Sequence, residues 1–449
     1  MASHTQWKNI RLGDVAKVIS GFAFKSKDFQ QEGIPIIKIK NIRVGSVDLS
    51  EIDHVDSSFL SLDTKYHVKG GDILISLTGS HLTQPNSVVG RVALYSSSLG
   101  HCLLNQRAGK IIITKPDICD KLFLFYSIYT EEKRREIALM ALGAASQANV
   151  SPSQVESVEM KLPPLSIQRK TAAILSAYDR LIENNTRRIE ILEEMARSIY
   201  REWFVKFRFP GHEQVQTVDS ELGLIPEGWE IKPVEDLLSY HIGGGWGEEE
   251  QSNQYPAVAY VIRGTDIPLA RLVSVVNCPL RFHKQSNFNS RKLELGDIVF
   301  EVSGGSKGQP VGRALLITQK LLKAFDSDVI CASFCKLLRV NKKVILPELL
   351  YLHLLDIYSN GRIDKYQVQS TGITNFKFAF FLESEQLLVP PLQWQAKFNK
   401  IAIPIFESIQ ALGAKNANLR KTRDLLLPRL ISGEIDVENL DINTGEIAA

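Results

Sequence analysis

The feature that most constrains this chain is that it repeats itself once. Groups of residues from the first half return in the second half in the same order, between 222 and 227 residues later. The matching segments are Trp7–Val15 with Trp229–Leu237, Gly71–Leu74 with Gly296–Val299, Val89–Arg91 with Val311–Arg313, and Leu162–Gln168 with Val389–Gln395. Collinear matches across 449 residues predict two tandem copies of one folding unit.

Each copy changes character once. A mixed region with β-branched runs such as Ile34–Ile39 comes first, and it includes an apolar-periodic segment, Lys121–Leu142, that we expect to be one helix. A segment without glycine or proline, Ser166–Phe204, then carries apolar residues at helical spacing. The second copy ends in a similar stripe, which Pro404 and Gly413 interrupt, so a kink is expected there.

The two helical segments are expected to pack on each other. A helix of about 35 to 40 residues is roughly 55 Å long, and its single apolar stripe must be buried. A globular region separates the two helices, which favours an antiparallel pair. Asn185 and Asn416 lie near the seam, where they either fix the register or face water.

These patterns predict an α+β fold: two tandem mixed α/β domains joined by two long helices in an antiparallel coiled coil, with pseudo-two-fold symmetry. The predicted boundaries are domain 1 over 1–160, the first long helix over 161–209, a linker over 210–222, domain 2 over 223–388, the second long helix over 389–432 and a tail over 433–449.

Composition narrows the class of protein. The formal charge is +3, so a nucleic-acid surface would have to come from the placement of charges. Met1–Ile10 is polar, and no run of 18 apolar residues occurs, which predicts a cytoplasmic protein without a signal peptide or membrane span. The five cysteines form no disulfide or zinc pattern, and we expect Cys331 and Cys335 to be reduced and buried.

Catalytic signatures are missing from the sequence. No methyltransferase tetrapeptide, phosphate-binding loop, serine-nucleophile or metalloprotease motif occurs. We interpret Gly243–Gly247, aligned with Gly21–Lys25, as a flexible turn, and Asp120 as a helix cap rather than part of a nuclease motif. We therefore expect no catalytic residues, metal or cofactor on this chain.

Two similar units at a fixed separation suit a linear target with two sites, and duplex DNA is such a target. Polar clusters at matching places in both copies are candidate DNA contacts, because Arg and Lys suit guanine edges or phosphates and Asn and Gln suit adenine edges. Solvated loops are the alternative. The candidates are Lys38, Lys40, Asn41, Arg43, Ser80, Thr83, Gln84, Arg107, Ser146, Gln147 and Asn149 in the first copy, and Arg263, Thr265, Ser303, Ser306, Lys307, Gln309, Lys365, Gln367, Thr371, Thr374 and Asn375 in the second.

Several motifs closely resemble the specificity subunits of type I restriction-modification systems. They are Ile225–Trp229 (IPEGW), Leu162–Gln168, Arg201–Phe207 with Pro210-Gly211, Leu425–Ile435, Gly71–Leu74 with Gly296–Val299, and Thr371–Asn375. The resemblance covers almost the whole chain. The first copy departs from it by starting near Trp7 without the Ile-Pro-Glu-Gly lead, and by having Gly143–Gln147 where the second copy has Ser370–Thr374.

The resemblance implies that each domain is a target-recognition domain reading one half of a bipartite, asymmetric DNA site, with the helices as a ruler. It also implies partners: two methyltransferase subunits, which would carry S-adenosylmethionine, and translocase-nuclease subunits. The chain itself would be non-catalytic. Two alternatives stay open, namely an enzyme with fused recognition domains and a scaffold whose units bind proteins.

Overall fold

The structure is a computed structural model that describes residues 7–80, 88–144, 147–221, 223–304, 310–370 and 373–445. The chain forms two compact units. Unit 1 combines Met1–Leu181 with Leu419–Ala449, and unit 2 is Ile182–Asn418. Each unit therefore includes part of both long helices. Among the described residues, none of the helices has the length and apolar character needed to cross a membrane.

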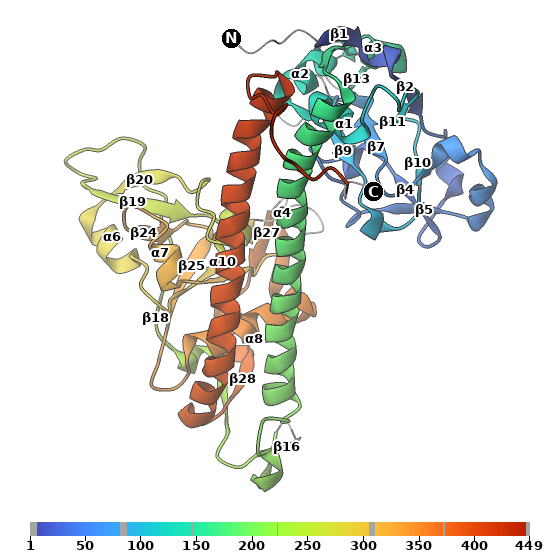
Figure 1. Cartoon of the computed structure of the whole chain (residues 1–449). Coiled ribbons are helices and arrows are strands. Elements are labelled where there is room, and N and C mark those ends of the chain that lie inside the picture. The colour runs from blue at the N-terminus through green and yellow to red at the C-terminus, as the bar shows by residue number, and fades with distance from the viewer. Residues whose placement is uncertain are drawn as a thin grey trace. The chain divides into compact units, whose positions relative to one another are not determined.

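Unit 1 is built from four small sheets and three short helices (Figure 1). In sheet order, the strands are β2 (Ala16–Ser20), β11 (Ala108–Ile113), β7 (Ile73–Ser76) and β9 (Val92–Leu94); β3 (Phe29–Gln30), β5 (Asp53–Val55), β4 (Ile34–Ile37), β10 (Cys102–Leu104) and β6 (His67–Val68); β12 (Leu142–Ala144), β13 (Gln147–Asn149) and β8 (Thr78–Gly79); and β1 (Lys8–Arg11) with β14 (Glu159–Leu162). The helices are α1 (Lys121–Tyr129), α2 (Glu131–Leu139) and α3 (Pro152–Glu156).

Unit 2 repeats this plan. In the same sheet order, its strands are β18 (Leu238–Gly243), β25 (Cys335–Val340), β21 (Ile298–Glu301) and β23 (Ala314–Leu316); β20 (Leu280–His283), β19 (Ala257–Ile262) and β24 (Val329–Cys331); β26 (Gln367–Ser370), β27 (Ile373–Phe376) and β22 (Ser303–Gly304); β17 (Glu230–Pro233) with β28 (Gln386–Val389); and β15 (Thr217–Ser220) with β16 (Gly223–Pro226). Its short helices are α5 (Ile267–Ala270), α6 (Gln285–Arg291), α7 (Gln319–Leu322), α8 (Pro347–Ser359) and α9 (Phe378–Ser384).

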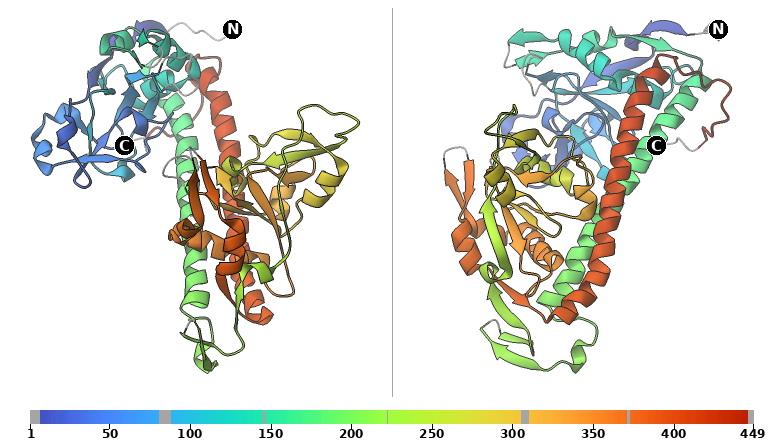
Figure 2. Two further views of the ribbon diagram at one scale, coloured as in Figure 1. Left: turned by 180° about the vertical axis from the view of Figure 1, so that it is seen from behind. Right: turned by 90° about the vertical axis from the view of Figure 1, so that its left-hand side faces the viewer.

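The long helices are α4 (Leu165–Tyr200), followed by a π-helical turn over Arg201–Val205, and α10 (Leu392–Ile431). They lie side by side within each unit (Figures 1 and 2). In unit 2, Asn185 contacts Asn416 while Trp203 contacts Phe398, so the two helices run in opposite directions, as predicted.

The asparagines of the helix pair face each other rather than water. Asn185 Nδ2 donates to Asn416 Oδ1 at 3.0 Å, and Asn416 Nδ2 donates to the Ile182 carbonyl at 3.2 Å. Asn416 is 3% exposed. A buried amide pair of this kind is satisfied in one alignment of the helices, which is how it fixes the register.

The helix α10 continues through both Pro404 and Gly413, so neither residue ends it, and the kink expected there stays a prediction. A Cβ atom on Gly413 would lie 2.5 Å from the Leu272 carbonyl oxygen. The glycine is therefore needed because α10 lies close to the loop after α5. This contact belongs to the tertiary structure and is not visible in the local sequence.

The start of each long helix is held by the same glutamine clamp. Gln168 Oε1 accepts from the Asp120 amide at 2.8 Å, and its Nε2 donates to the Ile118 and Pro163 carbonyls. Gln395 does the same in unit 2, with the Leu346 amide and the Val344 and Pro390 carbonyls. Both glutamines are fully buried, so the repeated motif is a structural joint.

Three further expectations concern the helix over Lys121–Leu142, the cap at Asp120 and the cysteines. The helix predicted over Lys121–Leu142 is two helices, because Thr130 caps a new start by accepting from the Lys133 amide. Asp120 is a helix cap, as predicted, accepting from the Phe123 amide at 2.9 Å. All five cysteines are free and buried, and burial raises the pKa of Cys331 to about 12.

The glycine-rich segment of unit 2 is not a flexible turn. A Cβ atom on Gly244 would lie 2.1 Å from the Ala332 carbonyl oxygen, and one on Gly21 would lie 2.2 Å from that of Leu104. Gly21 therefore corresponds to Gly244, not to Gly243 as the sequence alignment suggested. In both units the glycine lets one backbone cross closely over another.

Candidate nucleic-acid interface

Most of the predicted polar residues that the structure describes lie in two patches in each unit. We call the first the hairpin sheet: β12, β13 and β8 in unit 1, and β26, β27 and β22 in unit 2. Thr78 Oγ1 donates to Asn149 Oδ1 at 2.7 Å, and Ser303 Oγ donates to Asn375 Oδ1 at 2.8 Å. The two pairs occupy the same strand positions, and both asparagines are exposed. Each unit thus presents an oriented amide from a sheet rather than from a loose loop.

Three other candidate residues lie in or beside the hairpin sheets. Thr374 is half-buried on β27, next to Asn375. Ser80 is half-buried directly after β8. Gln147 belongs to β13, opposite Ala144. The strand pairs align Ala144 with Ser370 and Gln147 with Ile373, one residue away from the sequence alignment of Gly143 with Ser370.

We call the second patch the turn patch, because it surrounds a 3-10 turn that follows a central strand. The turn is Ile39–Asn41 in unit 1 and Gly264–Asp266 in unit 2. Asn41 is 2% exposed, accepts from the Lys38 amide and donates to the Asp48 and Glu51 carbonyls. The prediction that Asn41 contacts DNA is wrong, because its buried amide holds the turn together.

The cations of the turn patch are paired on the surface. Lys38 and Lys40 lie 3.0 and 3.3 Å from Asp53, and Lys38 also lies over the Phe29 ring. Burial opposes ionisation of Asp53, but hydrogen bonding to Lys38 and the two positive charges lower its pKa. Arg43 contacts Asp48 at 3.0 Å. Exposed ion pairs contribute little, so these cations can exchange their carboxylates for phosphates at small cost.

In unit 2 the equivalent positions are more tightly held. Arg263 contacts both carboxylate oxygens of Asp266, at 2.8 and 2.9 Å, and donates to the Asn277 carbonyl. Thr265 is exposed on the same turn. Arg107 of unit 1 is exposed between β10 and β11.

The remaining candidates of unit 2 have internal partners. Lys365 lies 3.1 Å from the buried carboxylate of Glu385, although half of its side chain is exposed. Gln367 accepts from the Val311 amide and donates to Asp364, and its contact with DNA stays a prediction. A further group of candidates lies outside the described residues: Thr83, Gln84, Ser146, Ser306, Lys307, Gln309 and Thr371.

A buried ion pair that sequence reasoning did not consider joins the two patches of unit 2. Arg313 donates to both carboxylate oxygens of Glu301, at 2.8 and 2.6 Å, and Glu301 is 2% exposed. Cβ atoms on Gly264 of the turn and Gly304 of β22 would lie 2.3 and 3.5 Å from Glu301 Oε1. The repeated Val-Gly-Arg motif was the available signal, since it aligns Arg313 with Arg91.

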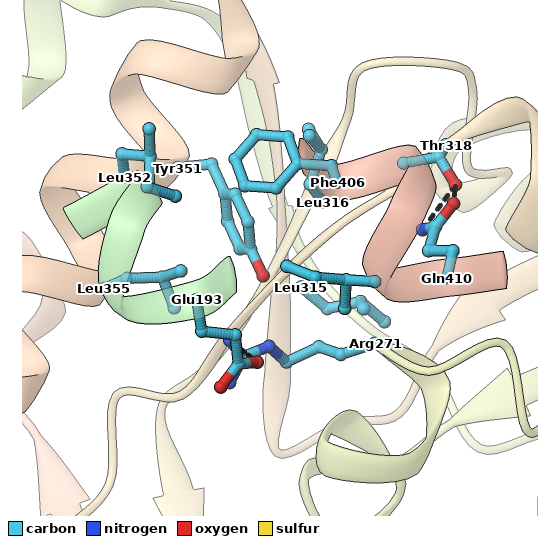
Figure 3. A pocket seen from close by; sticks show the side chains of 12 residues that line it. Glu193, Arg271, Leu315, Leu316, Thr318, Tyr351, Leu352, Leu355, Phe406 and Gln410 are labelled. Atoms are coloured by element: carbon cyan, nitrogen blue, oxygen red, sulfur yellow. Dashed lines mark hydrogen bonds and ion pairs between the residues drawn. The ribbon is translucent and has the colours of Figure 1, made fainter. Parts of the chain in front are cut away.

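Unit 2 also contains a small cavity beside its helix pair (Figure 3). Its volume is about 30 Å³, enough for a water molecule but far below the size of a ligand site. Arg271 contacts Glu193 of α4 at 2.9 Å on one side, and Thr318 hydrogen-bonds Gln410 of α10 on the other. The cavity is therefore a packing joint between the helices and the rest of unit 2.

Comparisons with known proteins agree with this geometry. Residues 4–194 match the type I restriction modification DNA specificity domain. The chain is 25% identical over 442 residues to the type I restriction enzyme MjaIX specificity subunit of Methanocaldococcus jannaschii, covering 97% of this chain and 94% of that protein. It is 22% identical to the HindI specificity subunit of Haemophilus influenzae, covering 96% and 100%.

A solved structure shows the same fold. The type I restriction-modification S subunit from M. genitalium superimposes with a TM-score of 0.55 at 14% identity, covering 96% of this chain and 98% of that one. These comparisons agree with the resemblance that the motifs indicated, and the chain is similar over almost its whole length to specificity subunits of type I restriction enzymes. The relatives are named specificity subunits, in accord with a non-catalytic role.

Proposed function

We propose that this chain is the sequence-specific DNA-binding subunit of a type I restriction-modification complex, and that each unit reads one half of a bipartite, asymmetric site. The observation that carries the proposal is the hairpin sheet. It holds an exposed asparagine at the same position in both units, Asn149 and Asn375, while the surrounding polar residues differ. A common scaffold with different contacting side chains is what two different half-sites require.

The specificity-subunit family implies assembly with the other subunits of the restriction-modification system. In our proposal two methyltransferase subunits bind this chain and carry S-adenosylmethionine, and translocase-nuclease subunits join them for cleavage. The chain would supply the recognition of the target and the scaffold for the complex, without any chemistry of its own.

The test is to co-express the full-length chain with a methyltransferase subunit of the same system and to map methylated bases across the host genome. We expect a single new motif with two short defined halves and a fixed undefined gap. An active complex that adds no sequence-specific methylation would refute the proposal and favour a protein-binding scaffold. Methyl transfer by the purified chain alone would favour a fused enzyme.

A further inference from the structure

Unit 1 contains a half-buried arginine, Arg91, for which no counter-charge is seen among the described residues. Arg91 stands at the strand position of Arg313, and Ser76 stands at that of Glu301: the Ser76 amide donates to the Arg91 carbonyl just as the Glu301 amide donates to that of Arg313. Unit 2 has two opposite charges at these positions. Unit 1 has an arginine and a serine instead.

Polar atoms of both residues lack partners. Arg91 Nε and Ser76 Oγ are buried and have no hydrogen-bond partner within the described part of the chain. Ser76 is 0% exposed and lies opposite Arg91 on the same face of the sheet. Buried polar groups are nearly always satisfied, so the two atoms show that Ser76 does not replace the carboxylate of Glu301 as a partner for the arginine.

The surroundings of Arg91 are positive. The Gly45 amide, two residues after Arg43, donates to the carbonyl of Val92, and a Cβ atom on Gly90 would lie 2.9 Å from the carbonyl oxygen of Arg134. The backbone segments that carry Arg43 and Arg134 thus lie against Val92 and Gly90, the residues on either side of Arg91. Burial, and then the positive charges of Arg134 and Arg43, lower the pKa of Arg91.

The two flanking arginines are held by ion pairs with exposed carboxylates, which an anion could replace. Arg43 is paired with Asp48 and Arg134 with Glu131, and those carboxylates are 37% and 75% exposed. Surface pairs of this kind are weak and easily exchanged. An unpaired guanidinium with two further arginine charges acting on it matches a phosphate, because the planar donors of arginine fit its oxygens in pairs.

We propose that Arg91, flanked by Arg43 and Arg134, binds a backbone phosphate of the DNA target on unit 1. The inference rests on the proposed function, because it assigns the anion to duplex DNA. In unit 2 the carboxylate of Glu301 takes the place of that phosphate. A phosphate contact fixes the position of unit 1 on the duplex and carries no base sequence.

The experiment compares the full-length wild type with Arg91→Met, and with Arg135→Met as a control that removes one charge from an exposed neighbour on α2. Binding to a target duplex and to a scrambled duplex is measured by fluorescence anisotropy over a series of KCl concentrations. We expect Arg91→Met to weaken both complexes about tenfold at low salt and to reduce the salt slope by about 1. Arg135→Met should keep the wild-type slope.

Stability distinguishes a binding arginine from a structural one. Removing an unpaired, half-buried charge should leave the urea midpoint of Arg91→Met equal to or above that of the wild type. A fall in stability with unchanged DNA binding would overturn the proposal, and so would unchanged affinity and slope.

The failure of the proposed function has a different signature, namely a wild type that does not prefer the target duplex. Thermal melting with inorganic phosphate, against chloride at equal ionic strength, then examines the site alone. Stabilisation of the wild type but not of Arg91→Met would assign the site to a small oxyanion and overturn its assignment to the DNA backbone.

Discussion

Replacing Glu385 with glutamine tests how unit 2 is held together. The side chain is 0% exposed. It accepts hydrogen bonds from Arg362 and from the Tyr366 hydroxyl, the latter at 2.6 Å, and lies 3.1 Å from both His353 Nε2 and Lys365 Nζ. All four neighbours donate to the carboxylate. The NH₂ group of a glutamine is itself a donor, so it cannot accept their hydrogen bonds, and it would face donors.

The magnitude follows from the pKa of Glu385. Burial opposes its ionisation, but the hydrogen bond and charge of His353, with Tyr366 and Arg362, lower the pKa from 4.5 to about 2. A lowered pKa in the folded state means that the carboxylate stabilises the fold above the unfolded value, and that this stabilisation is lost as the pH falls through 2. The shift corresponds to about 3 kcal/mol at neutral pH, similar to the roughly 3–5 kcal/mol cost of breaking a buried ion pair.

The assay is urea unfolding followed by tryptophan fluorescence, since Trp203, Trp229, Trp246 and Trp394 all belong to unit 2. We expect Glu385→Gln to lose about 3 kcal/mol at pH 7, and the gap to the wild type to shrink by about 2 kcal/mol at pH 3. Glu383→Gln, at an exposed position two residues away, should change stability by less than about 0.5 kcal/mol. A gap of equal size at both pH values would refute the electrostatic reasoning and assign the loss to packing.

Three further predictions concern the register of the long helices, the glutamine clamp at the start of α4, and the exposed asparagines of the two hairpin sheets. Asn416→Leu should cost about 1–2 kcal/mol, because it leaves the Asn185 amide unpaired, and the double variant with Asn185→Leu should recover most of it in a urea double-mutant cycle. Gln168→Leu should cost about 1–3 kcal/mol in urea unfolding of unit 1, because three backbone groups lose their partner. In methylation mapping, Asn149→Ala should relax one half of the target and Asn375→Ala the other, each by about 1–3 kcal/mol of discrimination; loss of both halves from either change would contradict one reader per half-site.

The sequence predicted the elements that depend on repetition and periodicity. The stripe over Ser166–Phe204 became α4 with its π-helical turn, because helical spacing over ten turns has no competing interpretation. The break at Thr130 was missed, since apolar residues continue through it and the cap is one hydroxyl. The reasons for Gly413 and Gly244 were missed because each is a backbone from elsewhere in the chain, which local patterns do not contain.

The candidate site was predictable by region but not by residue. Polar clusters at matching places located both the hairpin sheet and the turn patch. They could not separate Asn149, which is exposed, from Asn41, which is buried and saturated, because both are asparagines in polar surroundings. Arg91 was passed over as a repeat anchor, and its missing partner became visible only when Glu301 was seen beside Arg313.

The difference between Ser76 and Glu301 depends on a second difference in the turn. The carboxylate of Glu301 fits because Gly264 has no side chain, since a Cβ atom there would lie 2.3 Å from Oε1. The corresponding turn position in unit 1 is Ile39, which carries a side chain where Gly264 has none. The serine at position 76 and the isoleucine at position 39 thus differ together from the pair in unit 2. In our proposal unit 1 uses its arginine for a phosphate, while unit 2 uses its own for an internal ion pair.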